Sequence, residues 1–453
     1  MQDPLAVSIV SLGCAKNLVD TEVICGSIAA AGLYLAASPE DADIVLINTC
    51  SFIRDAREEA EKAIRDALRW KKRSRRQRRL VAVAGCLPQR DPEGCARAYP
   101  DVDVFLGLDD IPKAAELLRA AYDNALPGRN VPKSSLPTYL YDHTVPRLTV
   151  TPPAFAYIKI AEGCDHRCAY CAIPMIRGRQ RSRDLASVLA ECRQLLDQGA
   201  LELNLIAQDT TRYGREQPDG PTVEELLRQA DALPGDFWLR LLYAHPLYVT
   251  DELLELLAGG RHLVPYLDIP LQHISDNVLK GMRRGLDSRA TRALLTKIRS
   301  QYPSLALRTT FLVGFPGETE QDFQELLDFV QEIRFERLGA FAFSREEGTA
   351  AASLDNQTPA SVAKERLQLL LQTQQEIARA NNEAMIGKKL TVLLEDPLDN
   401  RRWIGRSQAD APDVDQQIIV TAANRKKLRT PAFAQVVIKS ADAYDLNAVI
   451  AEA

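Results

Sequence analysis

Short apolar runs alternate with helical patterns along most of the chain, in two series that a proline-rich segment separates. In the first series, up to about residue 120, the runs at 7–10, 44–47 and 80–83 have the composition of strands. Near-continuous apolar strands that alternate with helices indicate a parallel sheet covered on both faces. We therefore predict an N-terminal parallel α/β domain over residues 1–124.

The second series follows a linker. Prolines are frequent from residue 125 to residue 153 and periodicity is weak there, which predicts a linker. Further along, strands are expected at 156–160, 203–207, 238–243, 265–269, 307–313 and 338–343, with helices between them. Six strand–helix units are too few for a closed barrel of eight. We therefore predict a partial (β/α)6 barrel, similar to the TIM type, over residues 154–383.

Two of the predicted barrel helices have start signals in the sequence. Ser288 is placed to cap the helix that we expect at 287–301. Thr319 and Asp322 have the spacing of a capping box before the helix that we expect at 319–333. These signals predict where the two helices begin.

The C-terminal part of the chain has a different texture. A long helical pattern at about 360–385 ends near Gly387. Short strand-like runs then follow at 390–394, 403–405, 417–420 and 436–438. Several short strands in so few residues suggest a small β-barrel of the oligonucleotide-binding kind. We predict this barrel over residues 384–453.

Composition and charge narrow the class of protein. The chain has 46% hydrophobic and 26% charged residues, an ordinary globular composition. Its formal net charge of −5 argues against binding nucleic acid over the whole surface. No apolar run has membrane-spanning length, and the first four residues lack the layout of a secretory signal. We expect a cytoplasmic protein without a membrane partner. The basic run at 71–79 is either a solvated helix end or a contact to ribosomal RNA.

Three of the nine cysteines form the pattern CxxxCxxC, at Cys164, Cys168 and Cys171, just beyond the first barrel strand. In a reducing compartment, clustered cysteines indicate metal binding rather than disulfides. Four-iron clusters held wholly by protein use four cysteines, so three leave one iron open to a ligand. A zinc site with His166 as fourth ligand is the alternative, but its spacing is cramped compared with the separated ligand pairs of zinc sites.

A second set of cysteines follows the N-terminal strands. Cys14, Cys50 and Cys86 are 36 residues apart in each interval, and each lies a few residues beyond an apolar run. Parallel strands end at the same edge of a sheet, where ligands collect. A single cysteine in such a place is more often a small buried hydrophobe, but three together favour a second metal cluster.

Seven segments together match the pattern of one known family. They are LGCAKN at 12–17, NTCSF at 48–52, AGCLPQR at 84–90, CDHRCAYC at 164–171, DIPLQH at 268–273, MRRG at 282–285 and GFPGET at 314–319. This set resembles the radical S-adenosylmethionine (SAM) methylthiotransferases, and the tail is similar to a TRAM domain. The resemblance covers essentially the whole chain and implies an enzyme that transfers a sulfur-containing group.

The resemblance implies two [4Fe-4S] clusters and SAM as cofactors. SAM would bind the open iron held by Cys164, Cys168 and Cys171, and an electron supplied by a donor would release a 5′-deoxyadenosyl radical. The cluster on the other three cysteines would carry the sulfur to be inserted, and a further SAM would provide the methyl group. The cofactors carry this chemistry, so no side chain is expected to act as a catalytic acid or base.

Three further residues are candidates for contact with SAM. By the resemblance, Tyr170 lies near the adenine. Gly314 and Gly317 follow the fifth barrel strand and would allow the backbone to approach the cofactor. Glycines at these positions could equally serve a tight turn between strand and helix.

Two branches of the family differ in substrate. One, the MiaB type, modifies an adenosine in transfer RNA; the other, the RimO type, acts on the β-carbon of an aspartate in the twelfth small-subunit ribosomal protein. Residues 386–453 contain ten Lys/Arg and nine Asp/Glu, whereas a module that holds tRNA should be clearly basic. The acidic segment 405–415 resembles the RimO type and would suit a basic ribosomal protein, free or in an assembling subunit. We therefore favour the RimO type over the MiaB type and over a non-catalytic iron–sulfur carrier.

Overall fold

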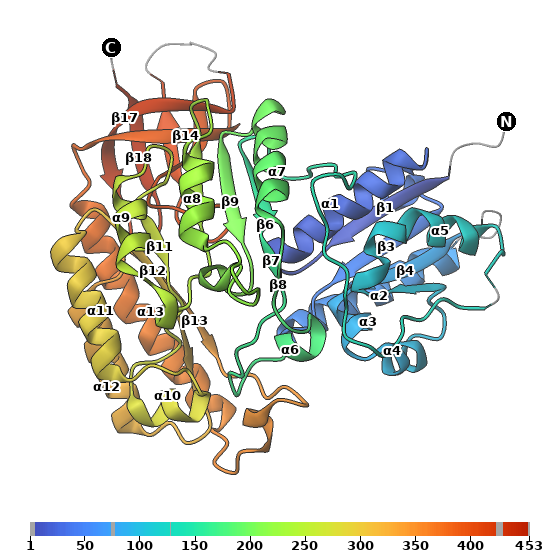
Figure 1. The fold of residues 1–453 in the computed structure, drawn as a ribbon, viewed down its shortest axis with the longest axis horizontal. Helices are drawn as coiled ribbons and strands as arrows, with labels where there is room; N and C mark the ends of the chain where they lie inside the picture. The colour runs from blue at the N-terminus through green and yellow to red at the C-terminus, as the bar shows by residue number, and fades with distance from the viewer. Residues whose placement is uncertain (1–4, 74–77, 127, 423–428, 452–453) are drawn as a thin grey trace.

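The N-terminal unit is a parallel sheet in the order β2-β1-β3-β4-β5 (Figure 1). It is seen in a computed structural model that describes residues 5–73, 78–126, 128–422 and 429–451. The strands are β1 (Ala6–Ser11), β2 (Tyr34–Leu35), β3 (Ile44–Thr49), β4 (Leu80–Gly85) and β5 (Val104–Leu106). The parallel α/β prediction is confirmed. β2 and β5 were not predicted, because two or three residues are too few to show a pattern.

Helices cover both faces of this sheet. Alternate residues of a strand point to opposite faces, and in β3 both sets are apolar. Ile44 and Leu46 pack with α1 (Ala15–Ala30) and α5 (Ala114–Tyr122), whereas Val45 and Ile47 pack with α2 (Arg54–Arg73). Burial on both sides explains why the central strands have almost no polar positions.

The predicted linker is packed against both neighbouring units. Arg147 pairs with Glu22 of α1 and with Glu191 of α7 (Leu185–Asp197). The buried Tyr141 donates its hydroxyl hydrogen to the same Glu191 across 3.1 Å. These contacts tie the N-terminal unit to the barrel, so the segment is a strap rather than a free tether.

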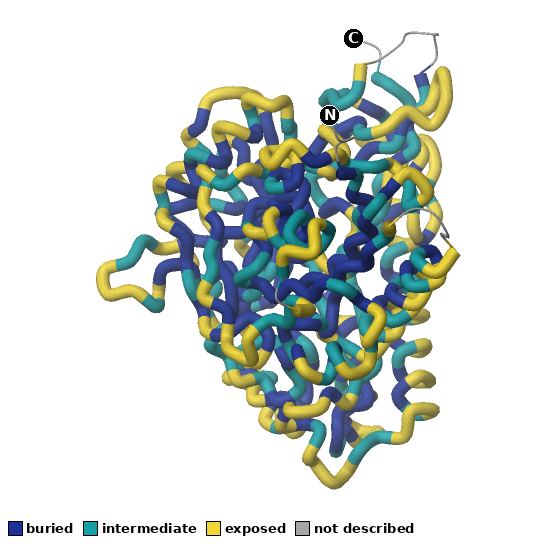
Figure 2. Tube along the Cα trace, turned by 90° about the vertical axis from the view of Figure 1, so that its right-hand side faces the viewer, coloured by how far each residue is buried: buried dark blue, intermediate teal, exposed yellow. Residues whose placement is uncertain are grey.

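The central unit is an open barrel of six parallel strands. They are β6 (Phe155–Lys159), β9 (Glu202–Ile206), β10 (Trp238–Leu241), β11 (Tyr266–Asp268), β12 (Ala306–Val313) and β13 (Arg337–Ala342). β10-β9-β6 and β11-β12-β13 form two sheets, and a bridge between Leu239 and Leu263 joins them. The outer helices include α8 (Val223–Asp231), α9 (Asp251–Gly259), α11 (Ser288–Gln301) and α12 (Glu320–Ile333). The partial barrel is confirmed. In Figure 2, buried residues gather inside the molecule and exposed residues lie on its outer turns.

The two predicted helix starts had different outcomes. Thr319 and Asp322 form the expected capping box before α12. The prediction for Ser288 is wrong, because Asp287 is the capping residue and its carboxylate accepts a hydrogen bond from the Ala290 amide at 2.7 Å. A carboxylate and a hydroxyl in adjacent positions are both good caps, so the sequence does not separate them.

The C-terminal unit is a closed five-stranded barrel that follows the helix α13 (Ala360–Glu383). Its strands are β14 (Lys389–Pro397), β15 (Arg402–Ser407), β16 (Ile418–Thr421), β17 (Ala432–Ala441) and β18 (Leu446–Ile450). The small barrel is confirmed, although β18 was not predicted. Among the described residues, no helix is both long and apolar enough to cross a membrane.

The segment 406–415, which we call the plug, connects the C-terminal barrel to the lumen of the central barrel. The Arg406 guanidinium donates to Glu202, the first residue of β9. Asp410 is fully buried and pairs with Arg337, the first residue of β13. The plug therefore closes the end of the central barrel at which its strands begin.

The remaining carboxylates of the plug are also used inside the protein. Asp415 accepts a hydrogen bond from the Tyr266 hydroxyl at 2.6 Å and pairs with Arg308 at 3.3 Å. Asp413 accepts a hydrogen bond from the Tyr157 hydroxyl at 2.9 Å. The prediction that this acidic segment recognises a basic protein is wrong for Asp410 and Asp415, because barrel arginines already neutralise them. Charge balance alone does not tell an internal partner from an external one.

Candidate functional site

The CxxxCxxC loop lies between β7 (Ala161–Glu162) and α6 (Ile173–Ile176), at the end of the first barrel strand. Its backbone is held from both sides: the Cys164 amide donates to Gly178 at 3.1 Å, and the Ala169 amide donates to Met282 at 3.0 Å. The pKa of Cys164 and of Cys171 is raised to about 12, chiefly by burial, with the neighbouring Cys168 acting in the same direction. Thiols that oppose one another's ionisation require a cation to become thiolates together.

The three N-terminal cysteines meet at one edge of the sheet, as predicted. Cys14, Cys50 and Cys86 each follow a strand directly or within a short turn. A side chain at Gly13 would lie 2.7 Å from Cys50 Cβ, which shows how closely these loops approach. Burial raises the pKa of Cys86 to about 12, and Cys50 and Cys14 add to this rise against the effect of Arg177. The group is therefore a second set of mutually interacting thiols.

The two cysteine sets face each other across the junction of the N-terminal unit and the barrel. Cys86 packs against Ala172 and Ile176, which follow Cys171 in the other loop. The Arg177 guanidinium lies 3.5 Å from Cys86 Sγ and donates to Asn17 at 2.7 Å. The two sets are thus joined by one short helix and one arginine.

Buried charges stabilise this junction. Arg177 also pairs with Glu162 and with Asp20 of α1, both at 2.9 Å. Lys159, the last residue of β6, pairs with the same two carboxylates at 2.5 Å. The two cations lower the pKa of Glu162 well below its usual range against the effect of burial. Two cations and two carboxylates balance, so this network of four side chains is neutral.

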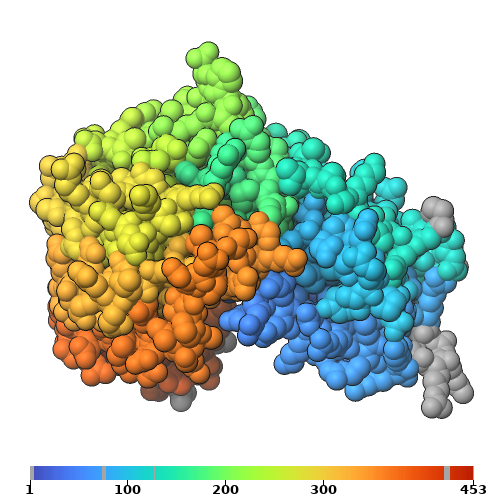
Figure 3. All heavy atoms as spheres, turned by 90° about the horizontal axis from the view of Figure 1, so that it is seen from below, coloured from blue at the N-terminus to red at the C-terminus, as the bar shows by residue number. Residues whose placement is uncertain are grey.

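The segment 344–353, which we call the latch, crosses the same junction on another side. The side chain of Glu346, 1% exposed, pairs with Arg57 of α2 and with Arg90 of α3 (Cys86–Arg90). Further along the latch, the Ala351 amide donates to the Ala169 carbonyl of the CxxxCxxC loop at 2.8 Å. In Figure 3, the orange segment that contains the latch reaches the blue N-terminal unit. The latch therefore contacts the CxxxCxxC loop and the helix that begins at Cys86.

Replacing Glu346 by alanine should loosen the latch, because Arg57 and Arg90 would lose their shared carboxylate. A charged hydrogen-bonded group of this kind contributes about 1.5–3 kcal/mol. Hydrogen exchange of the latch should become about tenfold faster or more, while exchange in the C-terminal barrel stays unchanged. The exposed neighbour Glu347 is the matched control, and Glu347→Ala should have little effect. Equal exchange rates in the two variants would contradict the role of Glu346.

The other predicted residues have defined places. Tyr170 lies beside the CxxxCxxC loop's cysteines, with its hydroxyl 3.5 Å from the Arg284 guanidinium. Gly314 has a φ of +75°, and a Cβ there would lie 2.4 Å from that of Ala363, so it permits the approach of α13. Gly317 has a φ of +82° and open space around it, which fits a turn. Contact of these three residues with SAM stays a prediction.

The imidazole of His166 pairs with Asp209 rather than with the cysteine thiols. Its Nε2 lies 2.6 Å from Asp209, and its ring stacks on that of His245 at 4.0 Å. Burial lowers the pKa of His245 to about 2, with Arg284 and His166 acting in the same direction. This arrangement orients His166 toward Asp209 and disfavours the zinc alternative, in which it would complete the cysteine set.

Sequence reasoning missed several residues that build the junction. Lys16 and Asn17 belong to the first cysteine motif, so that motif could have indicated them. Arg177 and Glu346 lie in loops without a recognisable pattern, and their roles appear only once distant segments meet. The signal for such residues is three-dimensional.

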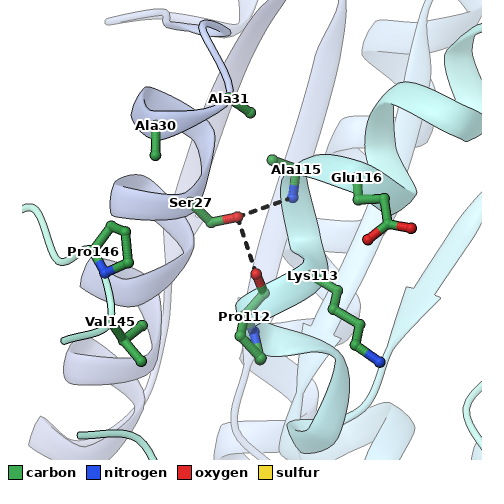
Figure 4. A pocket seen from close by; sticks show the side chains of 9 residues that line it. All are labelled: Ser27, Ala30, Ala31, Pro112, Lys113, Ala115, Glu116, Val145 and Pro146. Atoms are coloured by element: carbon green, nitrogen blue, oxygen red, sulfur yellow. Dashed lines mark hydrogen bonds between the residues drawn. The ribbon is translucent and has the colours of Figure 1, made fainter.

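A cavity of about 350 Å³ lies elsewhere, at the other end of α1 (Figure 4). It lies between the end of α1, the start of α5 and the strap; its lining is Ser27, Ala30, Ala31, Pro112, Lys113, Ala115, Glu116, Val145 and Pro146. At 1.5 Å per residue, the helix places Ser27 about 20 Å from Cys14. The cavity is therefore separate from the cysteine sets.

Three protein-family models match the chain. Residues 6–107 match the uncharacterized protein family UPF0004, residues 158–330 match the radical SAM superfamily, and residues 386–451 match the TRAM domain. These matches fall on the N-terminal sheet, the open barrel and the C-terminal barrel. They agree with the resemblance that the cysteine motifs carry.

Curated relatives decide the family. The chain is 46% identical over 419 residues to the ribosomal protein uS12 methylthiotransferase RimO of Syntrophotalea carbinolica, an alignment that covers 92% of this chain and 91% of the relative. It is 43% identical over 446 residues to the protein of the same name from Pelotomaculum thermopropionicum, with 98% of each chain covered. The chain belongs to the RimO family. The family prediction is thereby confirmed.

Solved structures support the fold of this RimO family member. The radical SAM methyltransferase TsrM from Kitasatospora setae, solved with cobalamin and a [4Fe-4S] cluster, has a TM-score of 0.57 at 17% identity, covering 77% of this chain and 73% of TsrM. The cobalamin-dependent SAM radical enzyme OxsB has a TM-score of 0.52 at 14% identity, covering 82% and 56% of the two chains. At these identities the likeness concerns the fold alone.

Proposed function

We propose that this protein inserts a methylthio group at the β-carbon of an aspartate of ribosomal protein uS12, using two [4Fe-4S] clusters and SAM. The observation that carries the proposal is that two cysteine triads face each other across one junction: the set in the CxxxCxxC loop and the set that follows the N-terminal strands. The RimO relatives match the chain over more than nine-tenths of its length. Substrate and cofactors follow from the relatives' names and from the radical SAM match.

The residues present fit two clusters, each with one open iron. Cys164, Cys168 and Cys171 would hold one, and the N-terminal triad Cys14, Cys50 and Cys86 would hold the other. Every donor is a thiol without a disulfide partner, which is the ligand that iron–sulfur clusters use. Bound there, the clusters and SAM would supply the radical and the sulfur, which no side chain can provide.

The side chains around the cysteines hold and shield the site. Arg177 places a fixed positive charge beside Cys86, and Arg284 does the same for Cys168, 3.5 Å from its Sγ. Positive charge beside a thiolate favours its ionised form and raises the reduction potential of a bound cluster. The latch and the buried ion network cover the junction on two sides, next to where the cofactors would be held.

The modification of uS12 is the direct test. In cells that lack the gene, uS12 should lose the mass of one methylthio group from its aspartate, and a copy of the gene should restore it. Mass spectrometry of uS12 and nucleoside analysis of tRNA distinguish the two branches. Persistence of the methylthio mass on uS12, with loss of methylthio-adenosine from tRNA, would replace the proposal by the MiaB type.

Several finer points belong to the same proposal. We divide the work among the N-terminal domain (1–124), the linker (125–153), the radical SAM barrel (154–383) and the TRAM barrel (384–453). A ribosomal substrate places the reaction in the cytoplasm, with an external electron donor.

Contact of residues 71–79 with ribosomal RNA stays a prediction. In this run, Lys71 pairs with Asp103 and Arg79 lies over the Trp70 ring, so both cations already have partners in the protein. Residues 74–77 lie outside the described residues.

A further inference from the structure

Lys16 is a buried cation at the junction between the two cysteine triads. It stands two residues after Cys14, in the first turn of α1, and is only 7% exposed. Its Nζ lies 2.9 Å from the centre of the Tyr243 ring, just beyond the end of β10. The N-terminal unit thus extends one positive charge from its cysteine edge into the mouth of the barrel.

This cation lacks a carboxylate partner. Among the described residues, no carboxylate lies within salt-bridge distance of Lys16 Nζ. Asp268 is the nearest candidate along the barrel rim, but its two oxygens already accept hydrogen bonds from Arg308 and from the Tyr243 amide, both at 2.9 Å. Glu162 is likewise engaged by Lys159 and Arg177. Lys16 therefore differs from Lys159 and Arg177, which both pair with carboxylates.

Burying a cation without a carboxylate partner costs folding free energy unless an anionic ligand binds to it. Charges inside proteins are paired with few exceptions, and the ring face of a tyrosine replaces only part of a lost hydration shell. A lysine ammonium only donates hydrogen bonds, so the ligand that pairs with it is an anion with an oxygen acceptor. The position of Lys16, beside Cys14 and facing the barrel mouth, is where the reacting side chain of a substrate must lie if both triads act on it.

We propose that Lys16 binds the side-chain carboxylate of the substrate aspartate and so orients its β-carbon between the two triads. This inference rests on the proposed function and identifies the residue that makes an acidic side chain the preferred substrate. Lys16 is a substrate-binding residue that transfers no proton. Its contribution is the selection of aspartate over a neutral side chain of the same shape.

The test compares binding of purified uS12 with binding of a uS12 variant that has asparagine in place of the target aspartate. The enzyme is full-length, loaded with both clusters and kept anaerobic with SAM. Wild-type enzyme should bind uS12 about tenfold or more tightly than the asparagine variant, as expected for one charge-assisted hydrogen bond. Lys16→Met should bind both forms equally, and Lys16→Arg should keep a preference for aspartate.

Two controls separate this role from others. Lys62→Met, at an exposed position of α2, should retain the wild-type preference. Iron content and the visible absorption of Lys16→Met should equal those of the wild type, which excludes loss of the cluster beside Cys14. A preference for aspartate that survives in Lys16→Met would overturn the inference.

The failure of the inference can be told from the failure of the proposed function. If uS12 in the cell depends on this gene for its methylthio group but the wild-type enzyme binds both uS12 forms equally, only the role of Lys16 is contradicted. If uS12 keeps its methylthio group without the gene, the substrate assignment fails and the assignment of Lys16 to its aspartate fails with it.

Discussion

Replacing Cys164, Cys168 and Cys171 together by alanine should abolish the cleavage of SAM, with no 5′-deoxyadenosine formed under anaerobic reduction. The reason is that these three thiols would be the only protein ligands of the cluster that binds SAM. Replacing Cys14, Cys50 and Cys86 instead should leave SAM cleavage in place but eliminate methylthiolation of uS12. Chromatography of 5′-deoxyadenosine measures SAM cleavage, mass spectrometry measures the methylthiolation of uS12, and iron content per protein reports on the clusters.

The control for these variants is another buried cysteine. Cys192 is fully buried in α7 and packs in the barrel core, away from both triads. Cys192→Ala should keep the full iron content and both activities, with only a moderate loss of stability from the smaller side chain. If the triple variant of the CxxxCxxC loop still released 5′-deoxyadenosine, the assignment of that cluster would be wrong.

A large loss of stability is expected for Asp410→Ala. The carboxylate of Asp410 accepts a hydrogen bond from Arg337 at 2.8 Å and another from the Ser407 hydroxyl at 2.5 Å, with no exposed surface. Removing one partner of a buried pair leaves an uncompensated charge and costs about 3–5 kcal/mol. Urea denaturation should show this as a lower midpoint, and the barrel and the C-terminal unit should respond together.

An exposed pair provides the comparison. Asp66 pairs with Arg69 on the surface of α2, where half or more of each side chain is exposed. Solvent screens such pairs and their effect on folding is small, so Asp66→Ala should leave the midpoint unchanged. If Asp410→Ala were as mild as Asp66→Ala, the plug would not contribute to the stability of the barrel.

Much of the fold could be predicted because the elements that matter are periodic and long. The six barrel strands and the central strands β3 and β4 were all found; β3 and β4 are buried on both faces, and each barrel strand has enough apolar residues to stand out. The short strands β2 and β5 have no such pattern, and β18 alternates too briefly to show one. For Asp287 and Ser288, local geometry decides between two adjacent capping residues.

The residues of the candidate site likewise fall into those that the sequence predicts and those that it does not. The cysteines were predicted because a cluster requires thiols at a certain spacing, and that spacing is visible in the sequence. Arg177 meets Asn17 across 160 residues and Glu346 meets Arg57 across 289 residues of sequence, and only folding brings such partners together. The preference for a uS12-type substrate agreed with the relatives, yet the acidic segment that suggested it turned out to be an internal plug.

The plug is synthesised long after the barrel strands that it contacts. Glu202 and Arg406 are 204 residues apart, so Glu202 has Arg240 as a partner long before Arg406 is synthesised. At roughly 5–20 residues per second, a ribosome needs about 10–40 s to synthesise the interval. During that time Glu202 and Arg308 can pair with Arg240 and Asp268 of the barrel, but Asp410, the partner of Arg337, does not yet exist. The end of the barrel opposite the CxxxCxxC loop can therefore close only near the end of translation.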